Sequence, residues 1–348
     1  MPLISVVIAV HEVADYLDRC LDSVLGEPEV PVEVIAVDDA SADRSGAILA
    51  ARRDDRLTVI RTPAAAGPGP ARGLGAKEAR GEYVWFVDGD DELAPGALAA
   101  VADSLARLRP DVLVVDFENL YPDGTASPGG GARCLGGIAA GQTVTLAEHP
   151  ALIHLTMTAW SKVFRRDFLA GLGVAFGGAP HEDVPVTAAA LLTAKRIGVL
   201  NRACYRYRRD RRGSFLAAPS DGNFNIFAAY DQVFHLFLPE RPAVPAPVTP
   251  AVRAALFERA IWHYTTLLPL VPRRRRREFF GRMSADFRRW RPEGFSVPPG
   301  PRGVKFRLVA RDAYLAYSLL EPLNRLRLAL RISSIRQPSR LRQTDPRS

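Results

Sequence analysis

Cysteine is scarce in this sequence, with three residues among 348 and none of them in a CxxC pair. The isolated Cys20, Cys134 and Cys204 argue against a disulfide framework and against a zinc site, and they fit a reducing compartment. Long apolar runs are also missing. No stretch reaches the roughly 20 uninterrupted apolar residues of a membrane-spanning helix, and the short N-terminal run lacks the basic leader of a signal peptide. We therefore expect a cytoplasmic protein.

Acidic residues are few in the last third of the chain. Residues 241–348 carry 23 Lys+Arg against 7 Asp+Glu, whereas residues 1–240 carry 23 against 31, for a net charge of +8 overall. An acidic N-terminal part and a basic C-terminal part suggest two different functions. The hydrophobic content of 47% provides for a sizeable core, and 24% charged residues is ordinary for a globular protein.

The front of the chain alternates between apolar strand patterns and amphipathic helix patterns. Continuous apolar runs, such as residues 4–10, are typical of strands that are covered on both faces. The alternation predicts an α/β fold with a mostly parallel, doubly wound sheet. The expected strands are residues 4–10, 32–37, 57–61, 83–87, 112–117 and 197–207, and the expected helices are residues 14–25, 43–53 and 95–108.

A proline-rich stretch, RPAVPAPVTP at residues 241–250, is the predicted linker. It divides the chain into an α/β domain, residues 1–240, and a basic, mostly helical C-terminal region, residues 241–348. In the second part, amphipathic patterns separated by proline-rich breaks predict further helices. These patterns cover residues 251–270, 276–290 and 304–331.

Aspartates follow two of the predicted strands: Asp38 and Asp39 end the second, and Asp88, Asp90 and Asp91 follow the fourth. Ligands of parallel α/β sheets bind at the carboxyl ends of strands, so these side chains are expected to line one acidic pocket. Clustered carboxylates need a compensating cation, and hard oxygen ligands select Mg²⁺ or Mn²⁺, which usually also binds substrate phosphates. The sequence therefore predicts a diphosphate-bearing ligand; a plain turn followed by a helix cap is the alternative.

Three ordered blocks carry a family resemblance: LISVVIAVHEVADYLDRCLDSVL, EVIAVDDASADRSGAIL and GPARGLGAKEARGEYVWFVDGDDELAPGAL. Together they resemble inverting family 2 glycosyltransferases with the GT-A fold. The resemblance continues to about residue 215 through AWSKVFRRDFL, HEDVPVTAAALLTAKRI and CYRYRRDRRGSF. It implies transfer of a sugar from a nucleotide-diphosphate donor, usually UDP-linked, with inversion at the anomeric carbon. The chain departs from the family pattern at His11 and Glu12, after the first strand, and at Gly73, where an asparagine is usual.

The resemblance also implies roles for individual residues around the donor. Asp90 would be the direct metal ligand, and Asp88 would lie near the ribose. Asp39, with Asp38 beside it, would bind the uracil. The backbone after the first strand, at Ala9, Val10 and Glu12, would line the nucleotide pocket, and Arg72 would neutralise part of the nucleotide or order the loop.

Inversion requires a base that deprotonates the acceptor hydroxyl, and a carboxylate is the natural choice. The pair Glu182–Asp183 in HEDVPV precedes an apolar helical stretch. The resemblance implies Asp183 as the general base, with Glu182 completing the catalytic pair and His181 shaping the acceptor pocket. The alternative from the residues alone is a helix N-terminus, where an acidic side chain meets the helix dipole favourably.

Other residues in these blocks have two interpretations each. Trp160 could stack on an acceptor sugar or complete the core. Lys162 could approach the acceptor or remain solvated. The loop after residue 207 could close over the leaving diphosphate or be a solvated basic loop. Its candidate contacts are Arg208, Arg211, Arg212 and Ser214.

The basic C-terminal region mixes arginines with aromatic and leucine residues, above all between residues 273 and 331. This pattern suits peripheral contact with an anionic membrane surface, and it also suits an anionic polymer such as a teichoic acid. A helical bundle with an arginine-rich solvent face is the alternative. Nucleic acid is not expected as a partner, because no nucleic-acid-binding motif accompanies the charge.

The combined prediction is a metal-dependent, inverting glycosyltransferase of the hexosyltransferase type, with a nucleotide-sugar donor. Its expected acceptor is a cell-envelope polysaccharide, a teichoic acid or a lipid-linked sugar, and its expected place is the cytoplasm, including the inner face of the plasma membrane. Two alternatives stay open. A nucleotidyltransferase also uses clustered aspartates with a divalent ion, and a non-catalytic envelope scaffold would use the basic region alone.

Overall fold

The computed structural model describes residues 2–131, 135, 138, 141–210, 219–236 and 248–320. The chain forms two compact units, Met1–Pro272 and Arg273–Ser348, and each is described by itself. Most of the predicted linker at 241–250 lies outside the described residues, so the domain boundary placed there stays a prediction. The helix that follows the linker, α9 (Pro250–Leu267), belongs to the first unit.

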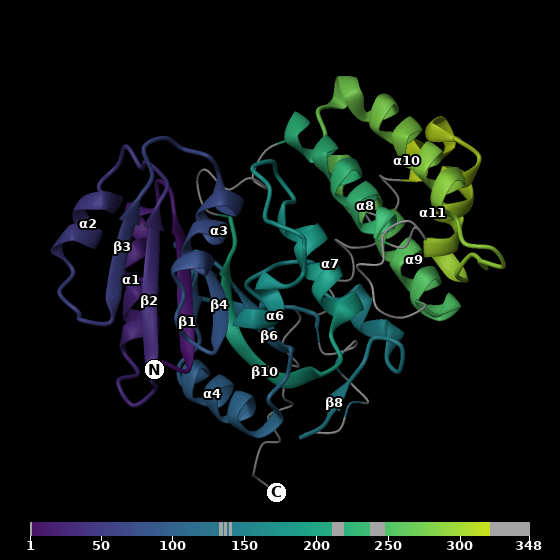
Figure 1. The fold of residues 1–348 in the computed structure, drawn as a ribbon. Helices are drawn as coiled ribbons and strands as arrows, with labels where there is room; N and C mark the ends of the chain where they lie inside the picture. The colour runs from purple at the N-terminus through teal and green to yellow at the C-terminus, as the bar shows by residue number, and fades with distance from the viewer. Residues whose placement is uncertain are drawn as a thin grey trace, which may run out of the picture. The chain divides into compact units, whose positions relative to one another are not determined.

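Four parallel strands form one half of the sheet in the first unit, in the order β3-β2-β1-β4 (Figure 1). Their bounds are β1 Ile4–Val10, β2 Val32–Asp38, β3 Leu57–Arg61 and β4 Tyr83–Asp88. The strand at the centre, β1, pairs in parallel with both β2 and β4. The predicted parallel α/β sheet is confirmed, and the predicted strand ends agree with the observed ends to within one residue.

The other half of the sheet continues in the order β9-β6-β10-β5, with β9 antiparallel to both β4 and β6. The bounds are β5 Glu92–Leu93, β6 Val112–Leu120, β9 Lys162–Arg165 and β10 Ile197–Arg208, and the short β7 Ala126–Pro128 and β8 Thr143–Val144 pair with β6 and β10. The prediction did not include β9, which joins the two halves.

Helices cover both faces of the sheet, as the continuous apolar strands require. The core on one face joins alternate strand residues, such as Val6 and Trp85, to α1 (Ala14–Leu25) and α4 (Ala97–Leu108). On the other face lies α3 (Pro68–Glu78), which packs so closely that a Cβ on Gly75 would lie 2.3 Å from Val7 Cγ1. The remaining helix of this region is α2 (Ser45–Ala51).

A helical layer completes the first unit. It contains α6 (Arg166–Ala170), α7 (Asp183–Thr193), α8 (Asn225–His235) and α9, with the 3₁₀ turns η1 (Pro150–His154), η2 (Asp221–Phe224) and η3 (Leu268–Leu270). Aromatic contacts join α8 to α9: the ring centroids of Phe227 and Tyr264 are 4.7 Å apart, and Tyr230 meets Tyr264 edge-on at 5.5 Å. Burying these large rings holds α9 against α8 within the first unit.

The second unit is built on α10 (Arg276–Trp290), preceded by η4 (Arg273–Arg275), and α11 (Gly300–Ala310). Its core contains Phe279, Phe280, Met283, Phe287, Phe306, Val309 and Tyr317. An ion pair between Arg277 and Asp312, at 2.7 Å, ties the start of α10 to the turn after α11. The predicted helix at 276–290 is confirmed, whereas α11 begins earlier and ends earlier than the predicted 304–331, of which residues 321–331 lie outside the description. Among the described helices, none is both long and apolar enough to cross a membrane.

Candidate active site

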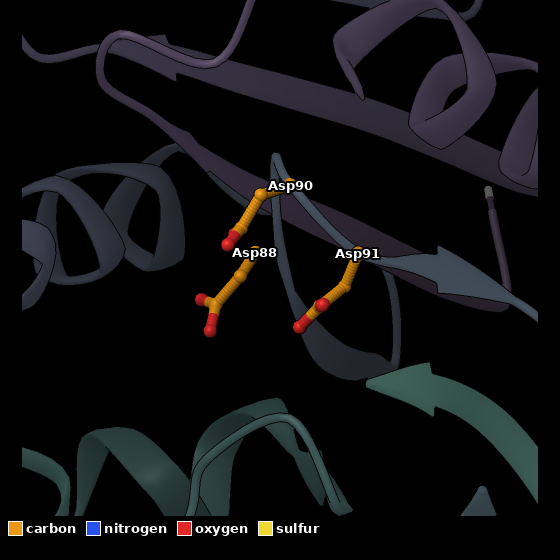
Figure 2. Close-up of side chains that lie close together, drawn as sticks. All are labelled: Asp88, Asp90 and Asp91. Carbon is orange, nitrogen blue, oxygen red and sulfur yellow. The ribbon is translucent and has the colours of Figure 1, made fainter. Parts of the chain in front are cut away.

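Three carboxylates gather where β4 ends. Asp88, Asp90 and Asp91 each offer an oxygen atom within 4.8 Å of the others, and Figure 2 shows their side chains extending to the same side of the loop. Asp91 is buried, and its two oxygens accept hydrogen bonds from the Tyr205 hydroxyl at 2.8 Å and from the Arg208 amide at 2.7 Å. Burial, together with Asp90 and Asp88, raises the pKa of Asp91 well above its ordinary value. Through these two hydrogen bonds, Asp91 attaches the aspartate loop to residues 205 and 208.

Asp88 and Asp90 are only half-buried, so their carboxylates are more accessible to a ligand than that of Asp91. All-oxygen donors of negative charge fit a hard divalent cation such as Mg²⁺ or Mn²⁺, and Mg²⁺ needs only one or two of them. The residues present therefore fit the predicted metal, and the choice of Asp90 as its direct ligand remains a prediction.

The aspartate loop is fixed by strands on both sides. The Gly89 amide donates to Ala9 O at 3.0 Å, and a Cβ at Gly89 would lie 3.0 Å from that same oxygen. From the other side, Arg208 Nε donates to Asp90 O at 2.9 Å. Arg208, predicted as a contact of the leaving diphosphate, thus holds the loop in this structure. Arg211, Arg212 and Ser214 lie outside the described residues.

The predicted nucleotide contacts meet at the carboxyl edge of β2, β1 and β4. Parallel register places Val10 opposite Asp38, and Ala9 opposite Asp88. The loops beyond are tied together, since Glu12 N donates to Ser41 Oγ at 3.2 Å. Glu12 has a φ of 52°, a left-handed conformation that is costly for a residue other than glycine. The structure therefore brings these residues to one edge, as the sequence predicted.

Asp38 and Asp39, both buried, are engaged with neighbouring chain segments. The Asp39 carboxylate accepts hydrogen bonds from the amides of Ala66 and Gly67, at 3.0 and 2.7 Å, and from the Thr62 hydroxyl at 3.0 Å. Asp38 accepts from the Ser41 amide and pairs with Arg61. Asp39 thus orders the loop that leads into α3, and the predicted contact of Asp39 with a base stays a prediction.

Arg72 joins the aspartate loop to the Glu182–Asp183 pair. Its guanidinium group pairs with Asp88 at 2.5 Å and with Glu182, and only 6% of its side chain is exposed. Burial alone would lower the pKa of Arg72, but Asp88 and Glu182 outweigh it and raise the pKa. For Glu182 burial has the opposite effect and raises the pKa, and the contact with Arg72 does not cancel this rise. Arg72 therefore connects the two groups of predicted site residues.

Asp183 is the first residue of α7, and burial followed by the charge of Glu182 raises its pKa to about 7. A base with a pKa near the working pH is the most effective in proton transfer. The neighbouring His181 has a φ of 69°, and its Nε2 lies 3.3 Å from Asn223 Oδ1. Burial lowers the pKa of His181 to about 4, so this ring is neutral at physiological pH.

Trp160 and Lys162 are both inside the protein. Trp160 is 5% exposed and stacks with Tyr205 at a centroid distance of 4.4 Å, with Phe117 meeting it edge-on at 4.8 Å. This packing fits the core alternative that the sequence left open. Lys162 is 0% exposed, so the solvated alternative for it is wrong. Sequence reasoning missed the burial of Lys162 because it depends on a loop that folds back over the strand.

Comparison with known proteins adds the family. The family model described as Glycosyl transferase family 2 matches residues 5–131, which include β1 to β4 and the aspartate loop. This part of the chain is therefore similar to family 2 glycosyltransferases. The family resemblance of the sequence is therefore confirmed.

Two curated relatives extend the similarity beyond the family 2 match. The chain is 27% identical over 214 residues to "Uncharacterized glycosyltransferase EpsJ" of Bacillus subtilis (strain 168), covering 60% of this chain and 62% of the relative. It is 27% identical over 221 residues to "Poly(ribitol-phosphate) beta-N-acetylglucosaminyltransferase TarS" of Staphylococcus aureus (strain MW2), covering 62% of this chain and 37% of the relative. The chain thus spans between about two fifths and three fifths of the length of these relatives.

A solved structure confirms the GT-A fold. A crystal structure of S. aureus TarS 1-349 in complex with UDP-GlcNAc superposes with a TM-score of 0.71 at 22% identity, over 94% of this chain and 92% of that one. At this level of identity the agreement concerns the fold.

Proposed function

We propose that the protein is a metal-dependent, inverting glycosyltransferase that transfers a sugar from a UDP-sugar to a hydroxyl group of a cell-envelope acceptor. The observation that carries the proposal is the bridge made by Arg72, which joins the donor-side carboxylate Asp88 to the base-side carboxylate Glu182. A transferase that inverts needs a metal-diphosphate site and a base in one site, and this chain places both sets of carboxylates around one cation.

The roles of the residues follow from their chemistry. Asp183 accepts the proton of the acceptor hydroxyl while the acceptor oxygen bonds to the anomeric carbon and the nucleotide leaves from the opposite face. Its pKa of about 7 makes it a stronger base than an ordinary aspartate. Glu182 and Arg72 hold the start of α7 against the donor side. The backbone of residues 9–12, together with Asp38 and Asp39, contributes to the pocket for the base of the nucleotide.

Asp90, assisted by Asp88, would hold the divalent ion. When bound there, Mg²⁺ or Mn²⁺ would neutralise the negative charge that develops on the leaving diphosphate. Asp91 is not a ligand in this proposal, because it is buried and each of its oxygens already accepts a hydrogen bond, one from Tyr205 and one from the Arg208 amide.

The proposed acceptor is an envelope polymer that carries hydroxyl groups, such as a polyol phosphate or a polysaccharide. The printed name of one relative, a poly(ribitol-phosphate) N-acetylglucosaminyltransferase, supports this class. A polyanionic acceptor also suits the surplus of arginine after residue 272. The proposed place of action is the cytoplasm at the inner face of the plasma membrane.

The proposal is tested by measuring UDP release from UDP-sugars with Mn²⁺, with poly(ribitol phosphate) as the first acceptor probe. A thermal-shift screen of UDP-sugars selects the donor, because a ligand that binds the folded state raises its melting temperature. Asp183→Asn and Asp90→Ala should each lower turnover by about a hundredfold or more. Asp103→Asn, at an exposed position of α4, is the matched control and should keep wild-type turnover.

Three outcomes would contradict the proposal. Full turnover in both site variants would show that the site is assigned wrongly. Recovery of the α-phosphate label of the donor in the polymer, instead of in UDP, would identify a nucleotidyltransferase. Binding of UDP-sugars without any turnover or hydrolysis would indicate the scaffold alternative.

A further inference from the structure

Lys162 is a lysine with no exposed surface, at the first position of β9. Its Nζ donates hydrogen bonds to Thr156 O at 2.6 Å, to Thr158 O at 3.0 Å and to Ser161 Oγ at 3.0 Å. All three acceptors are neutral oxygens, and in the described part of the chain no carboxylate oxygen lies within 4.0 Å of Nζ. A buried cation without such a partner is costly, so a nearby negative charge is expected to offset it.

The oxygens that hold Lys162 belong to a loop that contacts the start of α7. Met157, between the two threonines, accepts a hydrogen bond from Thr187 Oγ1 at 3.7 Å. The same hydroxyl donates to Asp183 O at 2.8 Å. One side chain thus connects the Lys162 loop to the first turn of the helix on which Asp183 lies.

The charged groups around this pair come from several elements. Asp183 interacts with Glu182 on its own helix, with Arg72 from α3 and with Asp88 from β4. Lys162 interacts with Asp183 and with Arg259 from α9, whose Nε lies 3.3 Å from Leu155 O. The Tyr230 hydroxyl from α8 completes the surroundings and contacts His263 at 3.2 Å.

The cations around Asp183 differ in how they are paired. Arg72 is in direct contact with Asp88 and Glu182, so its charge is shared between two other carboxylates. Among the described residues, no carboxylate contacts Lys162, and Asp183 is the acidic group that acts on it. Arg72 and, to a smaller extent, Lys162 both favour the ionised form of Asp183, and Lys162 is the one of the two whose charge is not already paired with other carboxylates.

We propose that Lys162 is a positioning residue for the base, and that its buried ammonium group keeps Asp183 ionised and ready to accept the proton of the acceptor hydroxyl. The inference rests on the proposed role of Asp183 and adds a residue to it. Lys162 does not touch the substrate in this role, because its side chain is fully enclosed.

The titration behaviour of the two groups agrees with this arrangement. Burial lowers the pKa of Lys162 to about 7, while the charge of Asp183 works in the opposite direction. Burial and Glu182 raise the pKa of Asp183 to about 7, while Arg72 and, less strongly, Lys162 work to lower it. Around neutral pH each charge thus favours the other, so loss of one partner is expected to shift the titration of its counterpart.

The first test needs no substrate, because the chain has only four lysines: Lys77, Lys162, Lys195 and Lys305. Lysine labelled with ¹³C at Cε gives four NMR signals in the full-length protein, and the signal lost in Lys162→Gln identifies Lys162. We expect this signal to titrate near pH 7 in the wild type and at lower pH in Asp183→Asn, where the stabilising negative charge is gone. Titration below about pH 5, which would leave Lys162 uncharged at neutral pH, or no shift in Asp183→Asn, would overturn the inference.

The second test is the pH profile of turnover. If Lys162 had a purely structural role, its replacement would not move this profile along the pH scale. Lys162→Gln removes the charge but keeps N–H donors for the loop oxygens, and it should move the acidic limb of kcat/KM upward by about one pH unit or more. Lys195→Gln, at an exposed position, is the control and should keep the wild-type limb. An unchanged limb in Lys162→Gln would refute the role of Lys162, whereas turnover that persists in Asp183→Asn would refute the base itself.

Discussion

At the scale of single residues, the site is defined by how a few cations are shared among many carboxylates. Arg72 contacts two of them, Asp88 and Glu182, although Glu182 is 110 residues away in sequence. Such sharing leaves the carboxylate pair at the start of α7 incompletely neutralised, and burial then raises the pKa of Glu182 and of Asp183. A raised pKa is a cost to the ionised form and an advantage to a general base.

This raised pKa predicts the pH dependence of turnover. Asp183 accepts a proton only when it is ionised, and its pKa lies near 7, well above the ordinary value for an aspartate. We therefore expect kcat/KM to be constant above about pH 8 and to fall about tenfold per pH unit below pH 6. Initial rates of UDP release from pH 5 to 9 check this, with Mn²⁺ kept saturating. A rate that stays constant down to pH 5 would exclude Asp183 as the base.

The donor-side residues could be predicted from the sequence, because strands of a parallel sheet end at one edge. Asp38, Asp88 and the backbone at Ala9 meet there for that reason alone. The burial of Lys162 could not be predicted, since nothing in the pattern WSKVF distinguishes a lysine enclosed by its own loop from a solvated one. Likewise, the sequence assigned Arg72 to the nucleotide but could not show its contact with Glu182.

At the scale of secondary structure elements, the parallel half of the sheet could be predicted and the antiparallel part could not. The strands β1, β2 and β4 are long apolar runs, whereas β9 has only four residues, begins with a lysine and ends with an arginine. Its place between β4 and β6 is determined by its pairing with these two strands. Short strands of this kind are defined by tertiary contacts more than by their own pattern.

The packing of α3 on the sheet gives a matched pair of glycine substitutions. A Cβ at Gly75 would lie 2.3 Å from Val7 Cγ1 and 3.3 Å from Val37 Cγ2, whereas a Cβ at Gly73 would meet nothing within 4 Å. Gly75→Ala should therefore lower the free energy of unfolding by about 1–3 kcal/mol through overpacking. Gly73→Ala should raise it by about 0.5–1 kcal/mol, because alanine favours the helix.

Urea unfolding followed by circular dichroism measures both glycine variants against the wild type. The expected order of unfolding midpoints is Gly73→Ala, then wild type, then Gly75→Ala. Equal midpoints for the two variants would mean that α3 does not pack on β1 and β2 as closely as the structure shows.

At the scale of the whole molecule, charge and exposed apolar surface are concentrated in the second unit. Residues 273–320 carry 13 Lys+Arg against 4 Asp+Glu. Leu315 and Leu319, four residues apart, are 78% and 73% exposed. A surplus of arginine together with exposed leucines suits the headgroups and the outer acyl region of an anionic bilayer. This combination supports the proposed action at the membrane.

The membrane proposal predicts binding of the full-length protein to vesicles that contain phosphatidylglycerol, and much weaker binding to phosphatidylcholine vesicles. Leu315→Glu should weaken the binding about tenfold, because it removes an apolar contact and adds a repelled charge. Val59→Glu is the matched control: Val59 is 43% exposed and belongs to the first unit, so the same charge is introduced outside the unit that carries the leucines. Vesicle sedimentation at low and at physiological salt measures both variants. If Leu315→Glu and Val59→Glu sediment alike, the leucines do not enter the bilayer. The surplus of arginine in this unit would then be explained by binding of the polymeric acceptor.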